Sequence, residues 1–173
     1  GHVWTGCVPT AMAQIIYYIN KTESAFQGIG SYAYTWQSWP ETSANFGNTT
    51  YDMNSMPNFV SDISDSGASE IAKLNYHAAV GCRAMWGAGS TGVIFNHNST
   101  HILCDMPMLA LVQNYLPLAA GADFIFKNSL YDTISDTDWQ NILRNELENN
   151  RVAYYRGGGH AWVCDGVDID DLF

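Results

Sequence analysis

An α+β fold is expected for this 173-residue chain on three grounds. Apolar residues recur at helical spacing in the first half of the chain and again near residue 140. Two strand-like segments come together at the end, around a run of three glycines. No repeat or shift in composition marks a boundary, so residues 1–173 are expected to form one domain. Because helices come first and strands later, an alternating α/β sheet is not expected.

The first predicted helix spans residues 8–19. Pro9 would lie in its first turn, where a missing N–H costs little. Thr5 and Gly6 come directly before it, which places Cys7 at the helix N-terminus. The apolar stripe of this helix comprises Val8, Ala11, Met12, Ile15, Ile16 and Ile19.

The middle of the chain is less regular. Residues 24–60 are rich in Gly, Ser, Asn, Tyr and Trp, which indicates extended loops with short strands. A second helix is predicted over 69–80, a loop over 86–101 and a third helix over 105–116. One face of the second helix would carry Ile71, Leu74 and Ala78.

The fourth helix has the clearest start. Ser135 followed by Asp138 resembles a capping box in which Asp replaces Glu, and Asn149-Asn150 would end the helix. Its apolar stripe comprises Trp139, Ile142, Leu143 and Leu147. Two strands are then predicted, over 151–156 and 160–165, separated by Gly157-Gly158-Gly159.

Charge and composition exclude several partners. The formal net charge is −10 and no cluster of Lys or Arg is present, so neither nucleic acid nor an anionic membrane surface is an expected partner. No apolar run approaches the ~20 residues of a membrane span. Residues 1–4 have no signal-peptide character, and the chain begins without Met, so we expect a processed product or a fragment.

Cys7 is the first candidate for chemistry. A thiol at a helix N-terminus is close to the positive end of the helix dipole and to free N–H groups, which favour the thiolate. The competing interpretation is a small buried apolar residue, as most free cysteines are.

His160 is the second candidate, since it follows three glycines that allow close approach to its imidazole. A lone histidine is more often a hydrogen-bonded residue at a strand end. However, His160 follows Cys7 by 153 residues, and papain-type peptidases place nucleophile and base in this order at similar spacing.

Five segments, in order along the chain, resemble the streptopain family of cysteine peptidases. Residues 5–18, Thr-Gly-Cys-Val-Pro-Thr-Ala-Met-Ala-Gln-Ile-Ile-Tyr-Tyr, are similar to the segment that holds the family's catalytic Cys. Residues 158–166, Gly-Gly-His-Ala-Trp-Val-Cys-Asp-Gly, are similar to the segment that holds its catalytic His. Further similarity covers residues 30–34, 51–56 and 138–147.

This resemblance implies a papain-like α+β fold, in which the helix carrying Cys7 packs against a late antiparallel sheet carrying His160. It also implies cysteine endopeptidase activity on protein or peptide substrates. Cys7 would attack the scissile carbonyl, His160 would act as acid and base, and the Cys7 backbone N–H would bind the oxyanion. No cofactor and no metal are expected.

The same resemblance suggests a substrate-binding loop. Residues 86–92, Trp-Gly-Ala-Gly-Ser-Thr-Gly, are similar to the family's Tyr-Gly-Pro-x-x-Ser-Gly loop, which lines the cleft. Gly87, Gly89 and Ser90, together with Gly159 beside the histidine, are therefore expected to bind substrate. An ordinary connecting loop is the alternative.

The sequence also departs from the family. The Asn-Trp-Gly-Trp-Gly stretch that follows the catalytic His is missing, because the chain ends at Phe173. No Gln precedes Cys7 to serve as an oxyanion donor, and there is no propeptide of the kind found in the family's bacterial, secreted zymogens. We therefore expect truncation at both ends and weak or no activity. A catalytically inactive homologue acting as a protein-binding or inhibitory module is the alternative function.

Other candidate sites are weaker. His97, His101 and Cys104 have zinc-ligand spacing only if they lie on a helix, and surface polar residues are expected instead. The acidic run 165–171 lacks the spacing of a calcium loop. Cys82, Cys104 and Cys164 are expected to remain buried thiols.

Overall fold

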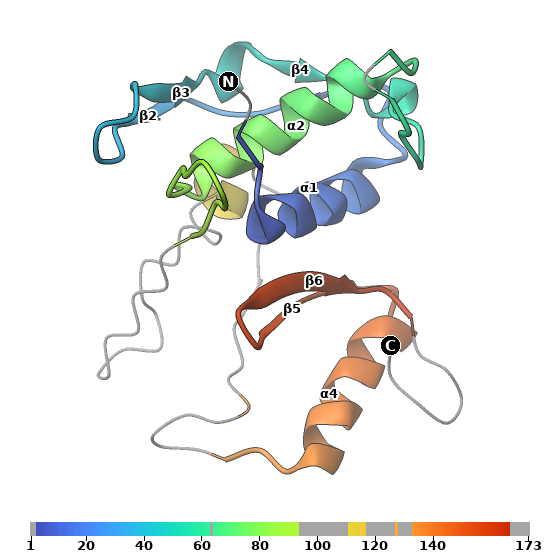
Figure 1. Ribbon diagram of the computed structural model, residues 1–173. Coiled ribbons are helices and arrows are strands. Elements are labelled where there is room, and N and C mark those ends of the chain that lie inside the picture. The colour runs from blue at the N-terminus through green and yellow to red at the C-terminus, as the bar shows by residue number, and fades with distance from the viewer. Residues whose placement is uncertain (1–2, 63, 94–110, 117–126, 128–132, 167–173) are drawn as a thin grey trace.

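The structure, a computed structural model, describes residues 3–62, 64–93, 111–116, 127 and 133–166 (Figure 1). The helices are α1 (Cys7–Asn20), α2 (Ala68–Gly81) and α4 (Asp136–Glu148), with a π-helical turn at Leu111–Tyr115 and short 3-10 turns at Phe46–Asn48 and Met53–Ser55. The strands are β1 (Phe26–Gln27), β2 (Tyr32–Tyr34), β3 (Thr42–Ala44), β4 (Thr50–Tyr51), β5 (Ala153–Gly157) and β6 (His160–Cys164). They form three antiparallel pairs, β1–β4, β2–β3 and β5–β6, which confirms the α+β prediction.

Helix α1 lies between the two halves of the described structure. Helix α2 packs on one side of it and the β5–β6 hairpin on the other (Figure 1). Most of its apolar residues are buried, and Ile16 is fully inaccessible to solvent. Ile19, predicted in the apolar stripe, is instead 43% exposed in the last turn of the helix. Truncating a fully buried side chain such as Ile16 to Ala typically costs about 2–5 kcal/mol, so α1 is the main packing element of the fold.

Helix α2 and the short strands enclose an aromatic core. Tyr51 and Phe46 are fully buried, and the Tyr51 hydroxyl lies 2.6 Å from His77 Nδ1. The His77 ring also packs edge-on against Phe46, with ring centroids 5.5 Å apart. Burial lowers the pKa of His77 below its usual value, and the nearby Lys73 ammonium lowers it further.

We expect this lowered pKa to make the fold less stable in mild acid. The unfolded chain protonates His77 near pH ~6.5 whereas the folded chain resists protonation, so stability falls as the pH drops below that value. The free energy of unfolding, measured in urea at pH 7.5 and 5.5, should drop more for the wild type than for His77→Gln. Equal drops would contradict this role of His77.

The third predicted helix differs from the structure. Residues 105–110 lie outside the described residues, and Leu111–Tyr115 forms a π-helical turn rather than an α-helix. The Leu116 N–H donates to the Leu111 carbonyl at 2.8 Å, and both leucine side chains are fully buried. The wider turn lets two leucines five residues apart enter the same core, which an α-helical pattern would not predict.

Helix α4 begins as predicted but with a modified cap. Ser135 Oγ accepts from the Asp138 N–H at 3.1 Å, as in a capping box. The Asp138 carboxylate accepts from the Ser135 hydroxyl at 2.6 Å, because the Asp side chain is one carbon shorter than the usual Glu. Trp139 packs against Tyr155, and Tyr155 against Trp162, which couples α4 to the hairpin.

Within the described ranges, no helix combines the length and apolar character needed to cross a membrane.

Candidate active site

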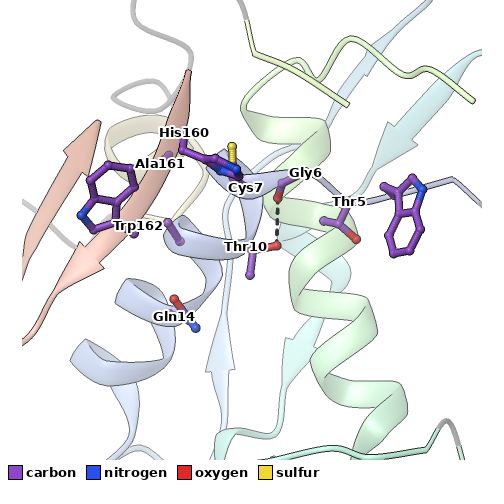
Figure 2. Close-up of a pocket in the computed structure, with 10 residues that line it drawn as sticks. Thr5, Gly6, Cys7, Thr10, Gln14, His160, Ala161 and Trp162 are labelled. Atoms are coloured by element: carbon purple, nitrogen blue, oxygen red, sulfur yellow. Dashed lines mark hydrogen bonds between the residues drawn. The ribbon is translucent and has the colours of Figure 1, made fainter. Parts of the chain in front are cut away.

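Cys7 is the first residue of α1, as the sequence predicted. Gly6 precedes it with φ 94° and ψ 155°, a conformation that is essentially restricted to glycine. A Cβ on Gly6 would lie 2.6 Å from the Thr91 carbonyl oxygen, so a loop distant in sequence packs directly against this turn. The Thr10 hydroxyl and N–H both donate to the Gly6 carbonyl, at 2.8 and 3.2 Å (Figure 2). These contacts fix the backbone on which the thiol stands.

Gly6→Ala is therefore expected to be strongly disruptive. The added methyl group meets both a backbone oxygen and an unfavourable φ, so we expect a loss of about 2–3 kcal/mol of unfolding free energy. Any residual folded protein should lose roughly 100-fold in peptide turnover, because the nucleophile would be displaced. Urea unfolding and kcat/KM measure the two effects. Gly166→Ala, whose Cβ would meet no atom within 4 Å and which does not line the pocket, is the matched control.

His160 begins β6 beside a tight turn. Gly158 and Gly159, with φ 57° and 82°, form the two-residue connection between β5 and β6, and Gly157 pairs with His160. Positive φ at both positions is typical of a type I′ hairpin turn. Two of the three glycines are thus required by the turn itself, and His160 stands exposed at its end.

Cys7 and His160 line one pocket with a volume of about 530 Å³. The close-up shows the two side chains directed into the same space from α1 and β6 (Figure 2). Thr10 and Gln14 continue the lining along α1, and Trp162 contributes from β6. The structure therefore brings together the two residues that the sequence singled out for catalysis.

The sheet face toward α1 is strongly desolvated. Burial raises the pKa of the Tyr154 phenol well above its usual range; Arg156 opposes this shift, and Cys82 and Cys7 add to it. The Tyr154 hydroxyl has no hydrogen-bond partner within the described residues. Burial also raises the pKa of the Cys82 thiol. Cys82 is therefore a thiol held in its neutral form behind the pocket.

The four predicted substrate-binding residues lie near the pocket without lining it. Gly87, Gly89 and Ser90 belong to a loop closed by paired hydrogen bonds between Met85 and Gly92. This loop reaches the site through the contact of Thr91 with Gly6. Gly159 lies in the hairpin turn next to His160. Their role in binding substrate stays a prediction.

Several pocket residues were not predicted from the sequence. Thr10 and Gln14 follow Cys7 by three and seven residues, on the stripe of α1 that its apolar residues leave free. This gap in the apolar pattern was the available signal. Trp4 also lines the pocket and is 71% exposed, but nothing in its sequence context indicates that position.

The weaker candidates are placed only in part. Cys82 and Cys164 are buried, as predicted, whereas Cys104 lies outside the described residues. His97 and His101 also lie outside them, as does most of the acidic run 165–171. Across the described ranges, no group of three or more His, Cys, Asp or Glu side chains could hold a metal ion.

Comparison with known proteins now decides the family. The model of the peptidase C10 family matches residues 1–173. The chain belongs to the peptidase C10 family. Streptopain from Streptococcus pyogenes is 28% identical over 96% of this chain, and the thiol protease/hemagglutinin PrtT from Porphyromonas gingivalis is 24% identical over 98% of it. The resemblance to streptopain peptidases is thereby confirmed.

Solved structures agree with this family assignment. The active wild-type interpain A cysteine protease of Prevotella intermedia superposes with a TM-score of 0.76 at 27% identity, covering 99% of this chain and 69% of that one. A fragment of prointerpain A from the same organism gives the same TM-score at 28% identity, covering 97% and 51%. These matches confirm the papain-like α+β fold. The C10 chain spans 41% of the streptopain relatives and 18% of PrtT.

Proposed function

We propose that this C10 family member is a cysteine-type endopeptidase in which Cys7 is the nucleophile and His160 the acid–base residue. The observation that carries the proposal is their meeting in one pocket, with Cys7 at the N-terminus of α1. Membership of a peptidase family and the names of its thiol and cysteine protease relatives support it.

The proposed reaction has two halves. The Cys7 thiolate attacks the scissile carbonyl carbon while the helix-initial N–H of Cys7 donates to the oxyanion. The imidazolium of His160 gives its proton to the leaving amine as the C–N bond breaks, leaving a thioester on Cys7. Neutral His160 then takes a proton from water, which attacks the thioester and releases the carboxylate and the thiol.

Protein or peptide chains are the proposed substrates, bound beside the loop that holds Gly87, Gly89 and Ser90 and beside Gly159. Extended substrate backbone could pair with the exposed backbone of such a loop.

A precursor propeptide and secretion are proposed by analogy with the pro-form of interpain A and with the bacterial relatives. We propose residues 1–173 as a single catalytic domain. Nucleic acids and membranes are not proposed as partners.

Hydrolysis of unlabelled peptides of mixed sequence tests this function. The 173-residue chain is incubated with 8–12-residue peptides, and mass spectrometry seeks fragment pairs whose masses add up to the parent peptide plus one water. Such pairs should form, and prior treatment with iodoacetamide should abolish them. Peptides that bind but stay intact would contradict the enzyme assignment and support an inactive binding module.

A further inference from the structure

One stripe of α1 is open to solvent and starts at the candidate nucleophile. Cys7, Thr10, Gln14 and Tyr17 follow one another at spacings of three, four and three, so they lie on one helix face. Thr10 and Gln14 are exposed and Tyr17 is half-buried, whereas the residues between them are buried. Between Cys7 and Tyr17, helix α1 is therefore open to solvent only along this stripe.

A second pocket, with a volume of about 300 Å³, runs beside the stripe from Thr10 to Tyr17. It opens between α1, α2 and the segment 56–60, and it shares Thr10 and Gln14 with the catalytic pocket. The two pockets are therefore adjacent, and Thr10 and Gln14 line both of them. We call the second pocket the α1 groove.

The α1 groove is apolar and uncharged. Its walls carry Tyr17, Met56, Phe59, Ile71 and Leu74, and no Asp, Glu, Lys, Arg or His lines it. Phe59 is 79% exposed, the highest exposure among the large apolar residues of the described chain. In a protein with a net charge of −10, an uncharged aromatic surface favours an apolar partner, because a buried charge would find no counter-charge there.

The groove is also held open by fixed contacts. The Tyr17 hydroxyl, from α1, lies 3.5 Å from the Met56 carbonyl and 3.4 Å from Asn58 Oδ1, so it ties the 56–60 segment to the helix. The amide of Gln14, midway along the stripe, makes no hydrogen bond to any described residue and can pair with an incoming peptide backbone. A pre-formed apolar wall beside a free amide suits an extended polypeptide.

The length of α1 between Cys7 and Tyr17 gives the distance from the reacting thiol to the far end of the α1 groove. Ten residues of α-helix from Cys7 to Tyr17 rise about 15 Å. An extended peptide advances about 3.3 Å per residue, so four or five residues span the same distance. A side chain beside Tyr17, at the far end of the α1 groove, would therefore belong to the substrate residue four or five positions from the scissile bond.

We propose that the α1 groove is an exosite that binds an apolar side chain of the substrate polypeptide, four or five residues from the bond cleaved. This proposal rests on the peptidase function proposed above. It assigns substrate selection to Phe59, Ile71 and Tyr17, at a distance from the reacting atoms. Because Thr10 and Gln14 line both pockets, a substrate chain bound at Cys7 is the occupant that can reach the α1 groove along the same helix.

Peptide binding to the inactive Cys7→Ala chain tests the exosite without any need for turnover. Fluorescein-labelled peptides are compared by fluorescence anisotropy. One carries four residues around a candidate cleavage site, and two longer ones add a Phe five residues away on either side. One of the longer peptides should bind about tenfold more tightly than the short one, as expected for burial of one aromatic side chain. Longer peptides that bind no better than the short one would overturn the proposal.

Phe59→Ala, made in the same background, should remove most of the tenfold difference. Because the Phe59 side chain is largely exposed, the variant should keep its fold, and unfolding in urea checks this directly. Ile29→Ala is the matched control, because Ile29 is 56% exposed and lies outside both pockets. Equal losses in the two variants would overturn the proposal.

Sedimentation and peptide cleavage separate the exosite from a self-association face and from the peptidase function itself. Sedimentation of wild-type protein and Phe59→Ala tests whether a second copy occupies the groove. A dimer that Phe59→Ala dissociates, with no preference for longer peptides, would make the groove a self-association face and overturn the exosite. Tight binding of a long peptide that the wild-type chain leaves intact would support the exosite and contradict the peptidase function. Cleavage at rates that depend neither on peptide length nor on Phe59 would support the peptidase function and contradict the exosite.

Discussion

Cys7→Ala is expected to lower kcat/KM for peptide hydrolysis by about 10⁴-fold or more, because it removes the only atom that can form the thioester. Cys7 is partly exposed at the first position of α1, and Ala is compatible with a helix start. The unfolding free energy should therefore change by no more than about 0.5 kcal/mol. Initial rates on a fluorogenic peptide, together with urea unfolding, measure both quantities.

Cys82→Ala is the matched control for this variant. It makes the same atomic change at a thiol that is fully buried and does not line the pocket. We expect turnover within a few-fold of the wild type and a stability loss on the order of 1 kcal/mol, from the small cavity. If Cys7→Ala keeps its activity while Cys82→Ala loses it, the nucleophile assignment is wrong.

His160→Gln is expected to have the second-largest effect, with kcat/KM lowered by about 10³- to 10⁴-fold. Gln keeps a polar side chain at the start of β6 but cannot carry a proton between leaving amine and water. Because His160 is exposed beside the turn, the fold should keep its stability to within about 0.5 kcal/mol.

His77→Gln provides the contrast for this variant, since it makes the same substitution in the aromatic core, away from the pocket. It should cost stability by removing the contact with the Tyr51 hydroxyl and leave the turnover of the folded protein largely intact. Turnover lost equally in the two variants would mean that stability, rather than proton transfer by His160, limits the rate.

Much of the fold could be predicted from local patterns. The apolar stripe of 8–19, the cap at Ser135 and the glycines before His160 each depend on neighbours a few residues away, and α1, α4 and β6 begin within a residue of the predicted positions. The π-helical turn at Leu111–Tyr115 could not be predicted, because it depends on packing two leucines into a core assembled from other segments.

In the candidate site too, some features are set by local sequence and others by contacts between distant segments. Cys7 and His160 could be selected because helix position and glycine context each indicate chemistry without tertiary information. The contact of Thr91 with Gly6 joins segments about 85 residues apart, and no local pattern encodes it. The loop of Gly87, Gly89 and Ser90 was expected to bind substrate from the family resemblance alone, and that role stays a prediction; its contact with Gly6 through Thr91 comes from the structure.

The pH dependence of Cys7 alkylation by iodoacetamide tests most directly whether Cys7 and His160 act together as a catalytic pair. Mass spectrometry of peptide fragments assigns the label to Cys7 and distinguishes it from Cys82, Cys104 and Cys164. If Cys7 and His160 form an ion pair, labelling should be fast well below pH ~8.5, where an ordinary thiol is half ionised. In His160→Gln, the labelling rate should instead follow the titration of an ordinary thiol. Labelling that follows an ordinary thiol titration in both proteins would contradict the Cys7–His160 ion pair.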